Sequence, residues 1–219
     1  AMADAKRQRR ERGPDTSPPL SNPKATQFLF GKYVLITGGT SGLGAEIARC
    51  AVNAAAAGVV ITGREAERGA AVISALTPIS ARQQILAFKQ ADLANPEECA
   101  AVFEFAKSKM GYVDCLVNCA AICFPRGSLT GVGAAPTSVD LWDKMQHVNL
   151  RAPFLLSQAF ATALKAEGKR GSIVNIASCC ATGGAPFVLA YSCSKAGLLV
   201  LTKNNAQELR SSGIRVNAI

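Results

Sequence analysis

Residues 33–54 constrain the fold more than any other stretch, because an apolar run enters a glycine-rich loop and then an amphipathic segment. Tyr33–Thr37 is short, apolar and β-branched, which is typical of a strand buried on both faces. The loop Thr37–Gly44 (TGGTSGLG) leads to apolar residues at helical spacing, and Gly58 ends that pattern. Glycines let a backbone approach a phosphate closely, and a helix amino terminus offers unpaired N–H groups. The stretch therefore predicts a phosphate-binding strand, loop and helix, with the spacing G-x-x-x-G-x-G rather than G-x-G-x-x-G.

The rest of the chain repeats this alternation of short apolar runs and helical patterns, which predicts one α/β domain over residues 28–219. With 219 residues, of which 49% are hydrophobic, the chain can bury one full core. No apolar run approaches the ~20 residues needed to cross a bilayer, so we expect no membrane-spanning role. Further strands are expected at 59–62, 85–88, 113–117, 171–176 and 213–219. One further helix is expected to end near Leu76, another to begin at Asn95, a third to span residues 139–165 and a fourth to carry Tyr191.

Residues 1–27 have a different composition from the rest. Ala1 before Met2 resembles a cloning scar, and the basic, proline-rich run that follows has almost no large apolar side chains, so we expect a disordered tail. Prolines and acidic residues in this tail would interrupt the amphipathic helix of a mitochondrial presequence. We therefore expect a cytoplasmic location, with organelle targeting by the basic tail as the open alternative. The net charge of +9 suits an enzyme that holds a polyphosphate or a nucleic-acid binder. No zinc-finger spacing and no basic helix with interleaved aromatic residues supports nucleic-acid binding. The hypothesis that the basic tail tethers the protein to a nucleic acid or a membrane surface has only its charge as support.

Eight cysteines without a signal-peptide pattern indicate a reducing compartment, in which thiols stay free. Cys115, Cys119 and Cys123 recur every four residues, but the chain has one histidine, His147, which we expect on a helix surface or at a subunit interface. Without a paired C-x-x-C or an H-x-x-x-H we expect no metal site. Three further cysteines flank the catalytic candidates described next, and we expect small-volume packing for them, with thiol sensitivity as the alternative: Cys179, Cys180 and Cys193.

A second constellation lies in residues 171–195, where a buried strand leads through a Gly-Gly-Ala-Pro loop to a helix with Tyr191 and Lys195 on one face. A phenol titrates near pH ~10, and an ammonium one turn away favours proton exchange at neutral pH, so Tyr191 is a candidate general acid/base. Ser178, at the end of the strand, is a candidate donor to a substrate carbonyl oxygen. Ser192–Lys195 also matches the S-x-x-K of serine acylases, but their S-D-N and K-T-G partners are missing, and no G-x-S-x-G indicates a hydrolase.

The end of the expected second strand bears on the choice of dinucleotide. An acidic residue there would hold the ribose 2′-hydroxyl of NAD, whereas an arginine nearby would favour the 2′-phosphate of NADP. The chain has neutral Thr62 and cationic Arg64 at this point. The sequence therefore favours NADP(H), with NAD(H) possible, and the alternative is that Arg64 is an ordinary solvated charge at a helix start.

With these residues in view, the chain from Phe28 to Ile219 resembles the short-chain dehydrogenase/reductase family. Thr37-Gly38-x-x-x-Gly42-x-Gly44 matches its T-G-x-x-x-G-x-G loop, and Asn149 falls at its helix asparagine. Ser178 and the Tyr191/Lys195 pair match its catalytic serine and Y-x-x-x-K. The resemblance implies a doubly wound, Rossmann-like parallel sheet with helices on both faces, and a cofactor bound by Gly38, Thr40, Ser41, Gly42, Leu43, Gly44, Arg64, Asp92, Leu93, Asn118, Ala120, Tyr191 and Lys195.

Two departures accompany the resemblance. The family's N-N-A-G stretch appears as Asn118-Cys119-Ala120-Ala121, so we expect its strand-end contacts to persist with backbone freedom altered at Ala121. The chain is also expected to stop at the sixth strand, where the family continues through a substrate lid and a last helix and strand.

The resemblance implies an oxidoreductase that moves a hydride between a nicotinamide and a carbonyl or alcohol carbon. In this reading Ser178 holds the oxygen, Tyr191 exchanges the proton, Lys195 lowers the pKa of Tyr191 and binds the nicotinamide ribose, and Asn149 supports a water-borne proton path. The implied partners are a small-molecule carbonyl or alcohol and a second copy or more, as a homodimer or homotetramer, with no nucleic acid or membrane. The alternative is a catalytically weak dinucleotide-binding or regulatory subunit without a complete lid. Sugar, polyol, steroid, 3-oxoacyl and xenobiotic substrates stay open.

Overall fold

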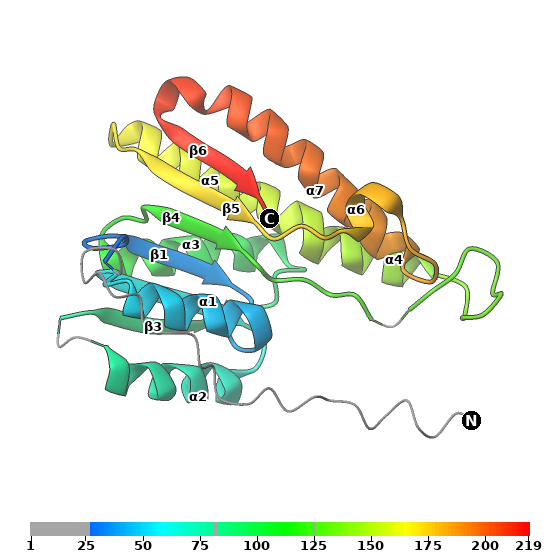
Figure 1. The fold of residues 1–219 in the computed structure, drawn as a ribbon, viewed down its shortest axis with the longest axis horizontal. Coiled ribbons are helices and arrows are strands. Elements are labelled where there is room, and N and C mark those ends of the chain that lie inside the picture. Colours follow the sequence, from blue (N-terminus) through cyan, green and yellow to red (C-terminus); the bar gives the residue numbers. More distant parts are fainter. Residues whose placement is uncertain (1–26, 81–82, 125) are drawn as a thin grey trace.

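The computed structural model describes residues 27–80, 83–124 and 126–219, and they form a six-stranded, all-parallel sheet (Figure 1). The strand order is β3-β2-β1-β4-β5-β6. The direction of winding reverses between β1 and β4, and in open α/β sheets the crevice at such a reversal is where ligands bind. The strands are β1 (Tyr33–Thr37), β2 (Gly58–Gly63), β3 (Ile85–Gln90), β4 (Cys115–Asn118), β5 (Gly171–Asn175) and β6 (Ile214–Ala218).

Helices cover both faces of this sheet, as the sequence predicts for a doubly wound fold (Figure 1). One core cluster joins the sheet to α1 (Gly42–Asn53) and α2 (Ala66–Leu76). A second, larger cluster joins the opposite face to α3 (Pro96–Met110) and α5 (Ala152–Ala166). The remaining elements are α4 (Val139–Gln146), α6 (Cys180–Gly183), α7 (Leu189–Glu208), the 3₁₀ turns η2 (Thr77–Ile79) and η4 (Arg210–Ser212), and the π-helical turn η3 (His147–Arg151).

The apolar strands are buried on both faces because alternate side chains enter opposite clusters. Leu35 of β1 lies in the cluster with α3 and α5, whereas Val34 and Ile36 lie in the cluster with α1. Each of the three is at most 2% exposed. Alternation of this kind follows from the two-residue period of a strand, and it accounts for the unbroken apolar run in the sequence.

The single long helix expected over 139–165 is instead three segments, because the π-helical turn η3 separates α4 from α5. Pro153 has no N–H, so it cannot donate the usual helical hydrogen bond to the carbonyl of Asn149 four residues earlier. The Asn149 side chain is also held from outside the helix, by the backbone of Ile122 and by Ser194. Both effects disturb the regular α-helical pattern at the same turn.

The sequence-based boundaries differ from the observed ones elsewhere by a few residues, most clearly at β4, which begins at Cys115 rather than at residue 113. The expected tail lies outside the described residues except for Gln27. Within the described ranges, no helix is both long enough and apolar enough to cross a bilayer.

Phe160 is the largest side chain with no exposed surface, and it packs from α5 onto the sheet. Replacing it in Phe160→Ala is expected to lower the free energy of unfolding by about 3–5 kcal/mol, because the variant loses burial and leaves a cavity. Phe124→Ala is the control, since Phe124 is also a phenylalanine but is 67% exposed; its cost is expected to stay below about 1 kcal/mol. Urea denaturation measures both, and equal losses would contradict this account of the core.

Candidate active site

A cavity of about 360 Å³ lies at the carboxyl ends of β1, β2 and β4, beside the reversal in strand order. The glycine loop after β1 forms one wall, and the segments after β2, β3 and β4 form the others. Most of the predicted binding residues line this cavity: Gly38, Thr40, Ser41, Gly42, Leu43, Gly44, Arg64, Asp92, Leu93 and Ala120. The fold therefore brings most of these residues to the wall of one cavity, and their binding of a cofactor stays a prediction.

The glycine loop folds so tightly that it leaves no room for a side chain at Gly38, Gly39 or Gly44. A Cβ added to Gly44 would lie 2.2 Å from the carbonyl oxygen of Gly38. A Cβ added to Gly38, which has φ +67°, would lie 2.8 Å from the Cα of Ala120. Thr37 strengthens this approach, because its Oγ1 accepts hydrogen bonds from the N–H groups of Cys119 and Ala120, both at 3.0 Å. The start of the loop is thereby fixed against the end of β4.

The amino end of α1 opens onto the cavity with its N–H groups free of side-chain caps. Ser41 is the N-cap residue, its side chain makes no capping bond, and the first turn has no acidic residue. Arg64 and Arg68 line the same cavity. A helix amino terminus beside two guanidinium groups favours an anionic ligand. Arg68 is not among the residues predicted from the sequence, although its spacing of one helical turn from Arg64 is a usable signal.

Asn118, also predicted to bind the cofactor, does not line this cavity, and its side chain bonds within the sheet. Its Nδ2 donates to Oδ1 of Asn175 at 2.8 Å, and Nδ2 of Asn175 donates to Oγ1 of Thr202 at 2.9 Å. These buried bonds connect β4 and β5 to α7. Ala121, the other departure from the family pattern, does not adopt positive φ, so its backbone conformation needs no glycine.

Lys195 is the most deeply buried charged side chain at the site, at 2% exposure. Its Nζ donates a hydrogen bond of 2.6 Å to the carbonyl oxygen of Ile176, which lines the cavity. Burial lowers the pKa of Lys195 from 10.5 to about 8, against smaller opposing effects of Cys119 and Cys123. The amine is therefore held next to the crevice in a state that can gain or lose a proton near neutral pH.

Tyr191 lies beside this amine, with 5.8 Å between Nζ of Lys195 and the centre of the phenol ring. The two residues share a face of α7, as their spacing predicts. Ser178 is partly buried after β5, and its Oγ accepts a hydrogen bond of 3.2 Å from the N–H of Cys180. Among the described residues, no direct hydrogen bond joins Ser178 to Tyr191 or to Lys195.

Asn149 is fully buried, and its side chain holds two elements together. Its Oδ1 accepts from the N–H of Ile122 and its Nδ2 donates to the carbonyl of Ile122, both at 2.8 Å. The same Nδ2 donates to Oγ of Ser194 at 3.1 Å, and Ser194 in turn donates to the carbonyl of Tyr191 at 2.7 Å. Asn149 and Ser194 thus fix the segment after β4 against the first turn of α7. Sequence reasoning missed Ser194, whose only signal is its position next to Lys195.

Across the described ranges, no three His, Cys, Asp or Glu side chains gather closely enough to hold a metal ion.

Comparison with known proteins agrees with this geometry. Residues 32–219 match the family model described as short chain dehydrogenase. The chain is 36% identical to the short chain dehydrogenase/reductase dpchG of Colletotrichum higginsianum, over 91% of this chain and 71% of that protein. It is 38% identical to a probable galactose dehydrogenase, GalD, of Rhizobium meliloti, over 89% of this chain and 73% of the relative.

A solved structure of a metagenomic short-chain oxidoreductase in complex with NADP superposes on the fold with a TM-score of 0.78. It is 33% identical, and the match covers 87% of this chain and 80% of that chain. Because the family model spans most of the chain and both relatives exceed 30% identity over most of it, the chain belongs to the short-chain dehydrogenase/reductase family of oxidoreductases.

Proposed function

We propose that this protein is an NADP(H)-dependent oxidoreductase that interconverts a carbonyl and an alcohol, with Tyr191 as the general acid/base. The observation that carries the proposal is the buried amine of Lys195, which lies against the phenol ring of Tyr191 and bonds to the wall of the glycine crevice. A module that only binds a dinucleotide has no use for a complete proton-transfer set, and this chain has Ser178 and Asn149 as well as Tyr191 and Lys195.

The residues of the crevice fit a dinucleotide. Close packing at Gly38 and Gly44 fixes the shape of the loop, and the open space where a Cβ would lie at Gly42 lets a phosphate approach the backbone. The uncapped end of α1 favours the charge of that phosphate. The guanidinium groups of Arg64 and Arg68 suit the 2′-phosphate of NADP. Arg68 also forms an ion pair with Glu65, with 2.8 Å between Nε of Arg68 and Oε2 of Glu65. When bound, the nicotinamide supplies or accepts the hydride.

Tyr191 handles the proton of the reaction. In reduction its phenol hydroxyl gives a proton to the substrate oxygen, and in oxidation the phenolate takes one from the alcohol. Ser178 donates a hydrogen bond to the same oxygen and orients it. A proton-transfer role of this kind contributes ~10²–10⁴ to the rate.

Lys195 supports Tyr191 by charge, because its ammonium stabilises a phenolate beside it. With a pKa of about 8, Lys195 also passes protons onward near neutral pH. We propose that Asn149 supports a water-borne proton path from Lys195 to solvent; Pro153, which has no N–H, cannot donate to its backbone carbonyl. The side chain of Asn149 has a positioning role in this scheme, through Ile122 and Ser194.

The substrate is a small carbonyl or alcohol compound, in line with relatives such as the probable galactose dehydrogenase. Assembly as a homodimer or homotetramer is supported by apolar side chains exposed on α5 and α7, Phe154 at 44% and Val200 at 57%. All eight cysteines are free thiols, which suits a cytoplasmic location.

Tyr191→Phe tests the proposed acid/base. The variant keeps the ring but loses the hydroxyl, so turnover is expected to fall by at least ~10² while the dissociation constant of NADPH stays within about twofold of the parent. Tyr112→Phe, which removes a hydroxyl far from the crevice, is the matched control and is expected to retain activity. Steady-state assays on a panel of carbonyl compounds with a fluorescence titration of NADPH give both quantities, and full activity in Tyr191→Phe would refute the role.

Arg64→Ser tests the choice of cofactor. Removing an exposed guanidinium that bonds to a 2′-phosphate is expected to weaken NADPH binding by at least about tenfold. NADH has no 2′-phosphate and serves as the internal control, so its dissociation constant is expected to stay the same. Titrations of both nucleotides against both proteins decide the matter, and equal losses for NADH and NADPH would contradict the assignment.

Lys195→Met tests the buried amine through pH. The folded pKa of about 8 lies below the unfolded value of 10.5, so between these values the unfolded chain binds more protons than the folded one. Relative to the variant, the parent is therefore expected to gain stability as pH rises from about 8 to about 10.5, by on the order of 3 kcal/mol. Urea denaturation of both proteins across this range measures the difference, and a flat difference would show that Lys195 titrates normally.

A further inference from the structure

One wall of the crevice is the short segment that follows β3, and side chains hold the backbone of this segment in place. Asp92 and Leu93 line the cavity. The N–H of Asp92 donates to Oε2 of Glu98 at 2.7 Å, and the N–H of Ala94 donates to Oδ1 of Asp92 at 3.0 Å. Sγ of Cys99 donates to the carbonyl of Leu93 at 3.5 Å. These bonds are local, because Glu98 and Cys99 belong to α3, the next helix along the chain.

One further bond to this segment comes from a distant part of the chain. Arg151, in the π-helical turn η3, donates from Nη2 to the carbonyl of Ala94, which is 57 positions away in the sequence. Nε of Arg151 is buried and has no hydrogen-bond partner among the residues that the structure describes. A buried donor without a partner lowers stability, so an apolar side chain would suit a residue that only filled this space. The arginine therefore points to a use for the bond to Ala94.

The turn that carries Arg151 also contacts the catalytic side of the site. Val148, in the same turn, lines the crevice. Asn149 bonds to the backbone of Ile122 and to Ser194 on α7, the helix of Tyr191 and Lys195. One turn of backbone is thus bonded to the wall after β3 through Arg151 and to the catalytic helix through Asn149.

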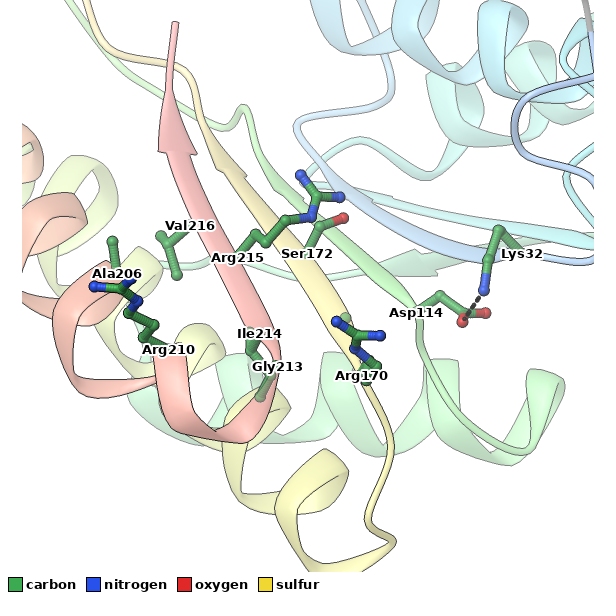
Figure 2. Close-up of a pocket in the computed structure, with 11 residues that line it drawn as sticks. Lys32, Asp114, Arg170, Ser172, Ala206, Arg210, Gly213, Ile214, Arg215 and Val216 are labelled. Carbon is green, nitrogen blue, oxygen red and sulfur yellow. Dashed lines mark hydrogen bonds and ion pairs between the residues drawn. The ribbon is translucent and has the colours of Figure 1, made fainter.

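The exposed arginines at the opposite edge of the sheet have no comparable arrangement. Arg170 lies directly before β5, and Arg215 lies on β6. Figure 2 shows the side chain of Arg210 on the other side of β6 from those of Arg170 and Arg215, so the three do not converge. Arg151 differs from them because its guanidinium is bonded to the backbone beside the crevice.

We propose that Arg151 is a positioning residue for the cofactor, and that its bond to Ala94 fixes the wall of Asp92 and Leu93 relative to α7. The inference rests on the proposed function, since the ligand of this wall is NADP(H). Nε2 of Gln90, at the end of β3, donates to the carbonyl of Arg64 at 2.9 Å, so the wall begins on the side proposed for the 2′-phosphate. Arg151 therefore acts on the binding of the adenosine half of the dinucleotide rather than on hydride transfer.

Arg151→Met tests this role, because the variant keeps a long side chain but has no donor for Ala94. NADPH, NADH and adenosine 2′,5′-bisphosphate are each titrated into the full chain. The variant is expected to bind all three about tenfold more weakly, since all three use the same wall. The KM for NADPH is expected to rise by a similar factor, while kcat at saturating NADPH stays within about twofold of the parent. A defect that only reduced the folded fraction would lower kcat instead.

Phe160→Ala is the control for a purely structural effect. An added Cβ at Gly171, the first residue of β5, would lie 2.7 Å from Cζ of Phe160, so this ring packs at the opposite edge of the sheet from the crevice. The control is expected to unfold at lower urea concentration than the parent and to bind NADPH within about twofold of it. Arg151→Lys keeps one donor, is expected to weaken the binding of all three ligands by about threefold, and decides the matter should Arg151→Met not fold.

The outcomes separate this inference from the proposed function. A parent protein that binds neither NADPH nor the bisphosphate would overturn both. If the parent binds both ligands and the Arg151 variants bind them equally tightly, the positioning role alone is wrong. A lower kcat in Arg151→Met with an unchanged KM for NADPH would also overturn it, because the residue would then act on turnover and not on the adenosine half of the cofactor.

Discussion

The geometry of the site depends on one interaction, the hydrogen bond from the buried ammonium of Lys195 to the carbonyl of Ile176. Burying this charge is costly, as its pKa of about 8 indicates, and the surrounding structure supplies the compensation. The bond ties α7 to the end of β5 beside the glycine crevice. It thereby brings the helix that carries Tyr191 to the edge of the sheet where a dinucleotide would lie. A solvated lysine at this position would give the phenol no fixed neighbour.

Other buried polar contacts surround that bond and serve the same end. Thr37 fixes the glycine loop to the end of β4, and Asn149 fixes the segment after β4 to Ser194 on α7. The chain from Asn118 through Asn175 to Thr202 does the same deeper in the sheet. Each of these side chains bonds across elements distant in sequence, so their combined effect is to define one geometry at the crevice. The polar core of this fold is therefore concentrated at the carboxyl edge of the strands, where chemistry is proposed.

Local patterns predicted most of the fold and much of the crevice. The run Tyr33–Thr37 is a strand with those bounds, and Asn95 caps α3 by accepting from the N–H of Glu97 as its position before Pro96 suggests. What escaped prediction depends on contacts between distant segments. The bond of Asn118 within the sheet needs Asn175, and the π-helical turn needs Ile122 as well as Pro153.

In the proposed mechanism, the phenol of Tyr191 and the amine of Lys195 converge beside the reactive ring of a bound dinucleotide. A crystal structure of the protein soaked with NADP tests this most directly. The account predicts the diphosphate on the glycine loop, the 2′-phosphate near Arg64, and the nicotinamide ribose within hydrogen-bond distance of Nζ of Lys195 and the hydroxyl of Tyr191. A nicotinamide ring bound away from both side chains, with the glycine loop occupied, would contradict it.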